Sequence, residues 1–208
     1  MKKIILLLCI IAISLSGCTV MEKHQVAKTA DTYWTHIEKG EWIQAVAMMD
    51  VQTSLSDKMD TVIDDAKTKK LILNEIDQTM RYTLSKMYKS HTIVSVSLND
   101  KQTQAKVKVK VRYIKPDVDT LKNQLYIDVL PYLMNQGDIP SIGERCRKDI
   151  QTSLKEGKVV TKTETMTLIK KKGDWLVQPP ENQSVWKVLN ASALVDNARF
   201  SNSLADIL

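Results

Sequence analysis

One stretch of the chain alternates residue by residue between apolar and basic side chains, and it constrains the fold more than any other part. The apolar positions are Ala105, Val107, Val109, Val111 and Tyr113. The basic positions between them are Lys106, Lys108, Lys110 and Arg112. Successive side chains of a β-strand point to opposite faces of its sheet. The pattern therefore predicts a strand with one face in a core and one in water, as antiparallel sheets allow.

Two hairpins are predicted around this strand. Residues 94–98 alternate between apolar and serine side chains, and the turn-forming pair Asn99-Asp100 follows them. A second hairpin runs from Val159 to Lys171, turns at Gly173-Asp174 and returns through residues 175–177. In residues 94–98 we expect Val94, Val96 and Leu98 to share the buried face.

Apolar residues at helical spacing occupy the chain before and between these hairpins. We expect a first helix ending at Gly40, a short helix carrying Trp42, and a long helical region from Ser54 to Met87. Residues 117–156 form a helical insert between the hairpins, with Gly137 and Pro140 in a loop inside it. The tail, residues 185–208, predicts a short helix. The fold class expected is α+β, with N-terminal helices packed on an antiparallel sheet.

The first eighteen residues have the order of an export signal. Two lysines precede an apolar run from Ile4 to Ile13, which is shorter than the roughly 20 residues that span a bilayer. Leu15-Ser16-Gly17-Cys18 follows and resembles the lipobox of bacterial lipoproteins. The resemblance implies a signal peptide of residues 1–17 and a diacylglycerol on Cys18. Two or more acyl chains anchor a protein durably. An ordinary signal peptide with an accidental cysteine is the alternative.

These boundaries leave a lipidated N-terminus and short tether, residues 18–23, and a single domain, residues 24–208. The net charge of the full chain is +6, and loss of two lysines with the signal leaves about +4. An exported, anchored domain meets anionic headgroups and wall polymers, so we expect no nucleic acid partner. Solubility alone explains the charge equally well. Cys146 is the one thiol left over, and its helical spacing from Ile142 and Ile150 predicts a buried structural residue.

Three short motifs carry a resemblance to a known superfamily. They are Tyr33-Trp34, Gly40-Glu41-Trp42 and Gly173-Asp174-Trp175-Leu176-Val177. Together with the order of elements from Val20 to Pro180, they resemble the cone-shaped nuclear-transport-factor-2-like (cystatin-like) superfamily. Within it, the chain is similar to small lipoprotein families of unknown function. The resemblance implies a curved sheet around a long helix and allows a homodimer. The insert from Asp117 to Glu156 departs from the pattern, and fold alone does not decide function.

No catalytic, cofactor or metal motif stands out. The histidines, His24, His36 and His91, do not share a helical ligand spacing, and phosphate-binding glycine loops are absent. Asp64, Asp65 and Asp77 could face the cone, but we expect each to be solvated. We therefore expect no enzyme activity, no cofactor and no metal.

Two groups of residues are candidates for contact with a ligand or partner. Lys106, Lys108, Lys110 and Arg112 line one strand face, where they either bind an anionic partner or only solvate the sheet and protect it from aggregation. Tyr33 and Trp34 are expected near the mouth of the cone. The favoured hypothesis is a lipid-anchored, outward-facing interaction module for an envelope protein, a peptide or an anionic wall polymer. A small-molecule binder using the cone is the alternative, and an enzyme is less favoured.

Overall fold

A computed structural model describes the backbone of residues 2–50, 65–116 and 138–179, and the side chains from residue 19 onward within these ranges. The elements of this part follow in chain order: α1 (Lys2–Lys39), α2 (Trp42–Ala47), α4 (Ala66–Met87), β1 (Tyr88–Leu98), β2 (Gln104–Lys115), α6 (Ile139–Glu156), β3 (Lys158–Lys171) and β4 (Asp174–Val177). The strands form one antiparallel sheet in the order β1-β2-β3-β4. The predicted α+β class is confirmed.

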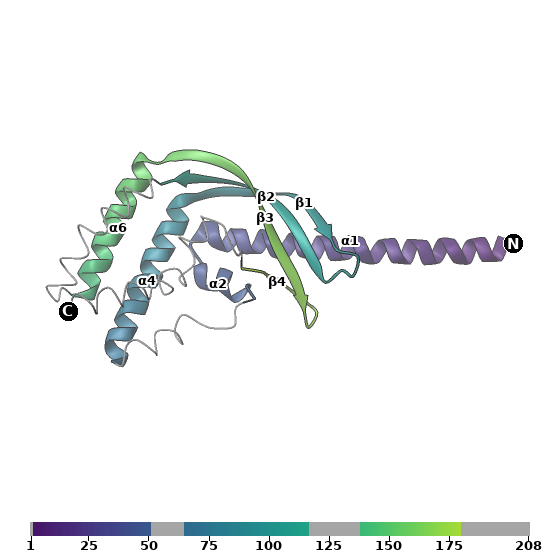
Figure 1. The fold of residues 1–208 in the computed structure, drawn as a ribbon, viewed down its shortest axis with the longest axis horizontal. Helices are drawn as coiled ribbons and strands as arrows, with labels where there is room; N and C mark the ends of the chain where they lie inside the picture. The colour runs from purple at the N-terminus through teal and green to yellow at the C-terminus, as the bar shows by residue number, and fades with distance from the viewer. Residues whose placement is uncertain (1, 51–64, 117–137, 180–208) are drawn as a thin grey trace, which may run out of the picture.

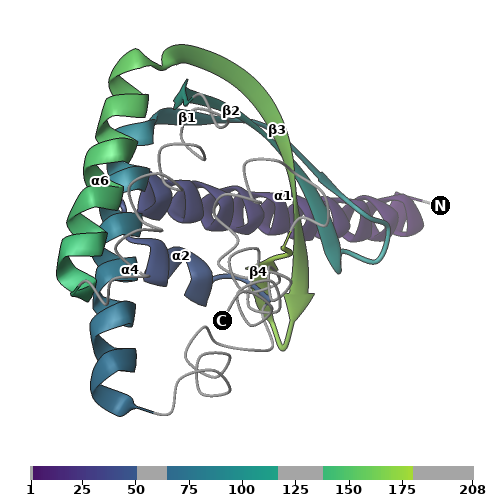
Figure 2. The same cartoon turned by 60° about the vertical axis from the view of Figure 1, so that its left-hand side comes forward.

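The sheet is curved, and α1 lies along its hollow side (Figures 1 and 2). The pair α4 and α6 stands at the end of the sheet away from the N-terminus, and α2 lies next to α1 on the side away from the sheet. We call the side of β1, β2 and β3 that faces away from α1 the outer face. Among the described elements, no helix lies over the outer face.

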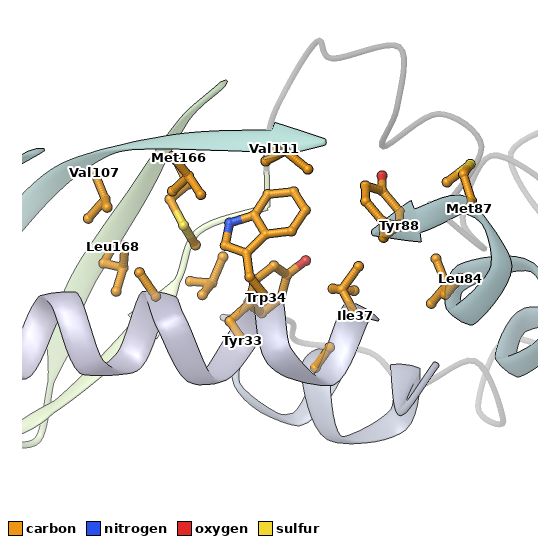
Figure 3. Close-up of a cluster of buried hydrophobic side chains, with 14 of the residues drawn as sticks. Tyr33, Trp34, Ile37, Leu84, Met87, Tyr88, Val107, Val111, Met166 and Leu168 are labelled. Carbon is orange, nitrogen blue, oxygen red and sulfur yellow. The ribbon is translucent and has the colours of Figure 1, made fainter. Parts of the chain in front are cut away.

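The core fills the space between α1 and the inner face of the sheet. Val107, Val109 and Val111 of β2 are fully buried there, as their alternation with basic residues predicts. Trp34 of α1 packs below them, with its ring edge-on to Tyr33 and Tyr88 at centroid distances of 5.9 and 5.7 Å (Figure 3). The sheet is therefore held to α1 by burial of large apolar side chains, the dominant favourable term in folding.

Local signals fix where the helices begin and end. Gly40 ends α1 with a positive φ of 73°, and a Cβ there would lie 2.4 Å from the carbonyl oxygen of Arg81. The carboxylates of Asp65 and Asp138 cap the N-termini of α4 and α6. Asp65 accepts from the backbone N–H groups of Lys67 and Thr68, and Asp138 from that of Ser141, and these N–H groups have no partner inside the helix.

The strand β1 differs from its prediction in two respects. It begins at Tyr88, directly after α4, rather than at Val94. A register shift between Ile93 and Ser95 then places Ile93 on the inner side and leaves Val94 56% exposed. A β-bulge adds one residue to a strand, so it reverses the alternation before it. The expectation that Val94 shares the buried face of Val96 and Leu98 was wrong for this reason.

Two further segments differ from expectation. Pro140 lies in the first turn of α6 rather than in a loop, a position where the missing N–H costs nothing. Thr19 to Lys23, expected to be a tether, belong to α1. The predicted helices around residues 121–133 and 185–208, and the start of the long helical region at Ser54, lie outside the described residues. So does the side chain of Cys18.

Candidate interaction surface

Four cations form a continuous row on the outer face. This basic stripe consists of Lys106, Lys108, Lys110 and Arg112 of β2, all of them exposed. Alternate residues of a strand are about 6.7 Å apart, so the stripe is about 20 Å long. Because β2 lies between β1 and β3, the stripe runs along the middle of the sheet rather than along an edge.

Hydroxyl side chains border the stripe on both sides. On β1, the residues paired with the four cations are Ser97, Ser95, Thr92 and Ser90. On β3, they are Thr167, Thr165, Thr163 and Thr161. Directly paired residues of neighbouring strands point to the same face. Each cation therefore lies between a serine or threonine of β1 and a threonine of β3.

On β1, β2 and β3, the outer face carries no acidic side chain that would neutralise the basic stripe. Glu164 is the single acidic residue in β1, β2 and β3. It is paired with Val109, which points inward, and its Oε1 lies 2.7 Å from Lys162 Nζ. Among the described residues, no carboxylate forms an ion pair with the basic stripe, whereas Lys170 and Lys171 pair with Glu22 and Asp50.

This arrangement is suited to binding anionic oxygens. Ammonium and guanidinium groups attract phosphate or carboxylate, and the neighbouring hydroxyls can donate hydrogen bonds to the same oxygens. The sequence analysis identified the cations as a candidate site but not the hydroxyl rows beside them. Their signal was present, because threonine recurs at every second residue from Thr161 to Thr167.

Tyr33 and Trp34 do not lie at a mouth. Tyr33 is fully buried and Trp34 is 4% exposed, and both belong to the core below the sheet. Burial raises the pKa of the Tyr33 phenol well above its ordinary value. The helical spacing of Val26, Ala30 and Ile37 puts these aromatic rings on the buried side of α1. The expectation that Tyr33 and Trp34 lie at the mouth of the cone and contact a partner was therefore wrong, because both are core residues.

Asp77 and His91, both considered for chemistry from the sequence, make structural contacts, whereas Asp64 lies outside the described residues. Asp77 accepts hydrogen bonds from Trp42 Nε1 at 2.7 Å and Arg81 Nε at 2.8 Å, which joins α2 to α4. The His91 ring stacks on Trp34 and contacts Glu38 through Nδ1 at 2.8 Å. Within the described part of the chain, no group of three or more His, Cys, Asp or Glu side chains could hold a metal ion.

Cys146 is half-buried on α6. Burial and, to a lesser extent, the nearby charge of Asp149 raise the pKa of its thiol. Since the thiolate is the reactive form, this environment disfavours nucleophilic or redox chemistry. The sequence predicted a buried residue, whereas the structure shows Cys146 half-buried, and its structural role stays a prediction.

The start of the domain is tied to two turns of the sheet. Thr19 Oγ1 accepts a hydrogen bond of 3.3 Å from Gln102 in the β1–β2 turn. Glu22 contacts Lys170 Nζ at 2.5 Å and Trp175 Nε1 at 3.0 Å, on either side of the β3–β4 turn. The hydrogen bonds from Lys170 and Trp175 lower the pKa of Glu22 below its ordinary value.

Comparisons with known proteins add little to this geometry. No family model and no curated protein matches the chain. Among solved structures, it is similar to a "putative lipoprotein (ycdA)" from Bacillus subtilis, with 18% sequence identity and a TM-score of 0.25. The match covers 64% of this chain and 38% of that one, so the chain spans well under half of that protein. A likeness of this size carries no argument about fold or function.

None of the described helices has both the length and the apolar character needed to cross a membrane. The cone-shaped superfamily expected from the short motifs is not confirmed by these comparisons and stays a prediction.

Proposed function

We propose that this chain is a lipid-anchored, outward-facing protein of the cell envelope, and that it binds an anionic partner through the outer face of its sheet. The observation that carries the proposal is the basic stripe, which hydroxyl rows border on both sides and which meets no acidic residue on the outer face of β1, β2 and β3. Its length of about 20 Å suits a linear polymer with repeated phosphate or carboxylate groups, such as an anionic wall polymer.

The anchor is supported by residues rather than by the comparisons. Two lysines and a short apolar run precede Leu15-Ser16-Gly17-Cys18, which resembles a lipobox. The Cys18 thiol would receive the diacylglycerol, and cleavage would leave Cys18 as the new N-terminus. Mass spectrometry of the membrane fraction tests this step. We expect a mature N-terminal peptide that begins at lipidated Cys18. A Cys18→Ser variant that is still cleaved after Gly17 and still held at the membrane would contradict it.

Binding by the outer face is tested with soluble probes. We expect linear polyphosphate and poly-glutamate to bind the domain, with an affinity that falls as salt is added, because exposed charges are screened. The variant K106Q/K108Q/K110Q/R112Q should lose at least tenfold in affinity by isothermal titration calorimetry.

A matched control separates a site from overall charge. The variant K28Q/K70Q/K148Q/K155Q also removes four positive charges, but from exposed positions on α1, α4 and α6. It should keep binding within about twofold. Equal losses in the two variants would show that net charge attracts the polymer and that the outer face is no specific site.

The proposed role is binding without catalysis. Its support is that Asp77, His36 and His91 are held in hydrogen bonds that join elements of the fold. A turnover that single substitutions of buried acids abolish would overturn it.

A small-molecule site in the interior is the second candidate. Trp34 Nε1 and the Tyr88 hydroxyl are buried and have no hydrogen-bond partner among the described residues. Buried polar groups normally have a partner, so each could serve a ligand. Native mass spectrometry of the gently extracted protein distinguishes the candidates. A reproducible small-molecule adduct would favour the interior, and a bound anionic oligomer would favour the outer face.

A further inference from the structure

The N-terminal end of the domain offers a second surface, separate from the basic stripe. Val20 and Met21 are 68% and 65% exposed, and both follow Cys18 on the same helix. These two consecutive residues are among the most exposed large apolar side chains of the described residues. They lie beside the turns that Thr19 and Glu22 contact.

No flexible spacer separates this end from the lipidation site. The helix continues through residues 18–23, and a helix rises 1.5 Å per residue, so Val20 and Met21 are about 3–5 Å along the axis from Cys18. The headgroup layer of one leaflet is about 5–7 Å thick. A lipid on Cys18 would therefore hold both side chains at the depth of the headgroups.

Contacts with the first turns of this part of α1 hold both sheet turns near the N-terminal end of the domain. Gln102 donates to Thr19, and Lys170 and Trp175 hold Glu22 one helical turn further on. The turns expose Lys101 and Lys172, and also the acids Asp100 and Asp174. With Lys23 of α1, the exposed cations outnumber the exposed acids, which favours an anionic leaflet.

The opposite end of the sheet is fixed at a greater height. His91 pairs with Val111 in the sheet and contacts Asp31 and Glu38 of α1. Asp31 is twelve residues beyond Thr19, or about 18 Å along the helix. Both α1 and β2 run away from the N-terminal end of the domain. Lys106 therefore lies at the end of the basic stripe nearer the anchor (the low end), and Arg112 lies at the end further from it (the high end).

We propose that the domain stands upright on the bilayer, resting on Val20, Met21 and the β1–β2 and β3–β4 turns, so that the basic stripe runs outward from the membrane. This inference rests on the anchor of the proposed function, but not on what the outer face binds. It assigns the lipid surface as the partner of this end and gives the stripe a defined direction.

Depth-dependent quenching tests the arrangement on the full lipidated protein. In a Cys146→Ser background, single cysteines are introduced by K101C, K172C and T161C and labelled with an environment-sensitive fluorophore. Thr161 is the matched control, because it lies beside Arg112 at the high end of the outer face. The vesicles contain phosphatidylglycerol and phosphatidylcholine in equal parts, with a nitroxide on a fraction of the headgroups.

We expect strong quenching of the labels at positions 101 and 172 and little at position 161. Equal quenching at all three positions would mean that the domain lies flat, and no quenching at any would mean that it is held away from the bilayer. Provided that the protein still floats with the vesicles, either result overturns the proposal. A lipidated protein that does not float would overturn the anchor and this inference together, and Cys18→Ser provides the unanchored reference.

Discussion

Glu22 is the residue whose ionisation links the start of α1 to the sheet. Hydrogen bonds from Lys170 and Trp175 lower its pKa in the folded protein. A carboxyl group with a lowered folded pKa stabilises the fold fully above its unfolded pKa, here 4.5, and this contribution is lost as the pH falls through the folded value. Acidification below about pH 4.5 should therefore weaken this contact.

The variant E22Q tests that contribution. At pH 7 it should unfold at a lower temperature than the wild type, and the difference should shrink as the pH falls toward 3, as followed by circular dichroism. The matched substitution D100N, at an exposed turn residue, should give no such pH-dependent difference. A gap between E22Q and wild type that stays constant over this range would show that charge at Glu22 has no part in the contact.

Two glycines provide a comparison at the same scale. Gly40 and Gly173 both have positive φ, which costs a non-glycine residue about 1–2 kcal/mol. At Gly40 a Cβ would also lie 2.4 Å from the backbone carbonyl oxygen of Arg81, whereas at Gly173 no atom lies within 4 Å. We expect G40A to lower the unfolding free energy clearly more than G173A in urea titrations. Similar losses in the two variants would mean that the approach of α1 to α4 can relax.

At the scale of the element, the inner face of β2 stabilises the fold, and its outer face carries the proposed binding residues. Val109 is fully buried, so V109A removes two methyl groups from the core and should cost about 2 kcal/mol. Lys108 and Lys110, its neighbours in sequence, are exposed, and K108Q/K110Q should change stability by less than about 0.5 kcal/mol. Thermal unfolding measures both. A stability loss in K108Q/K110Q equal to that of V109A would contradict the assignment of faces.

The elements with strong periodicity were predictable from sequence. The alternation at residues 105–113 correctly predicted a strand and its buried face, which is β2. The helical spacing that ends at Gly40 correctly predicted a helix and its buried side, which is α1. The bulge at Val94 was not predictable, because it depends on which residues of β2 are paired with β1. The bonds of Glu22 to Lys170 and Trp175 join residues about 150 positions apart, and no local pattern indicates such a contact.

The candidate site was predictable in part for the same reason. Basic residues at every second position of one strand identify their own face, but the serines and threonines beside them come from two other strands. Tyr33 and Trp34 were misplaced because large aromatic residues serve equally well in a core and at the rim of a pocket. Only the packing of α1 against the sheet decides between these locations.

At the scale of the whole molecule, the parts have separate tasks. In the proposed function, a lipid on Cys18 would hold the protein at the membrane, and α1 would connect that anchor to the core without a spacer. The inner face of the sheet is used for stability, which leaves the outer face available for a partner. A single sheet in this way carries both the core and the proposed binding surface.

The measurement that tests this account most directly is a comparison of lysine reactivity in the native envelope and in the purified protein. Intact envelopes and purified domain are acetylated briefly with a soluble reagent, and mass spectrometry follows Lys106, Lys108 and Lys110. We expect these three to react more slowly in the envelope, while the control lysines at positions 28, 70, 148 and 155 react alike in both. Equal reactivity of the three lysines in both samples would show that the outer face is unoccupied in the envelope and would contradict the central claim.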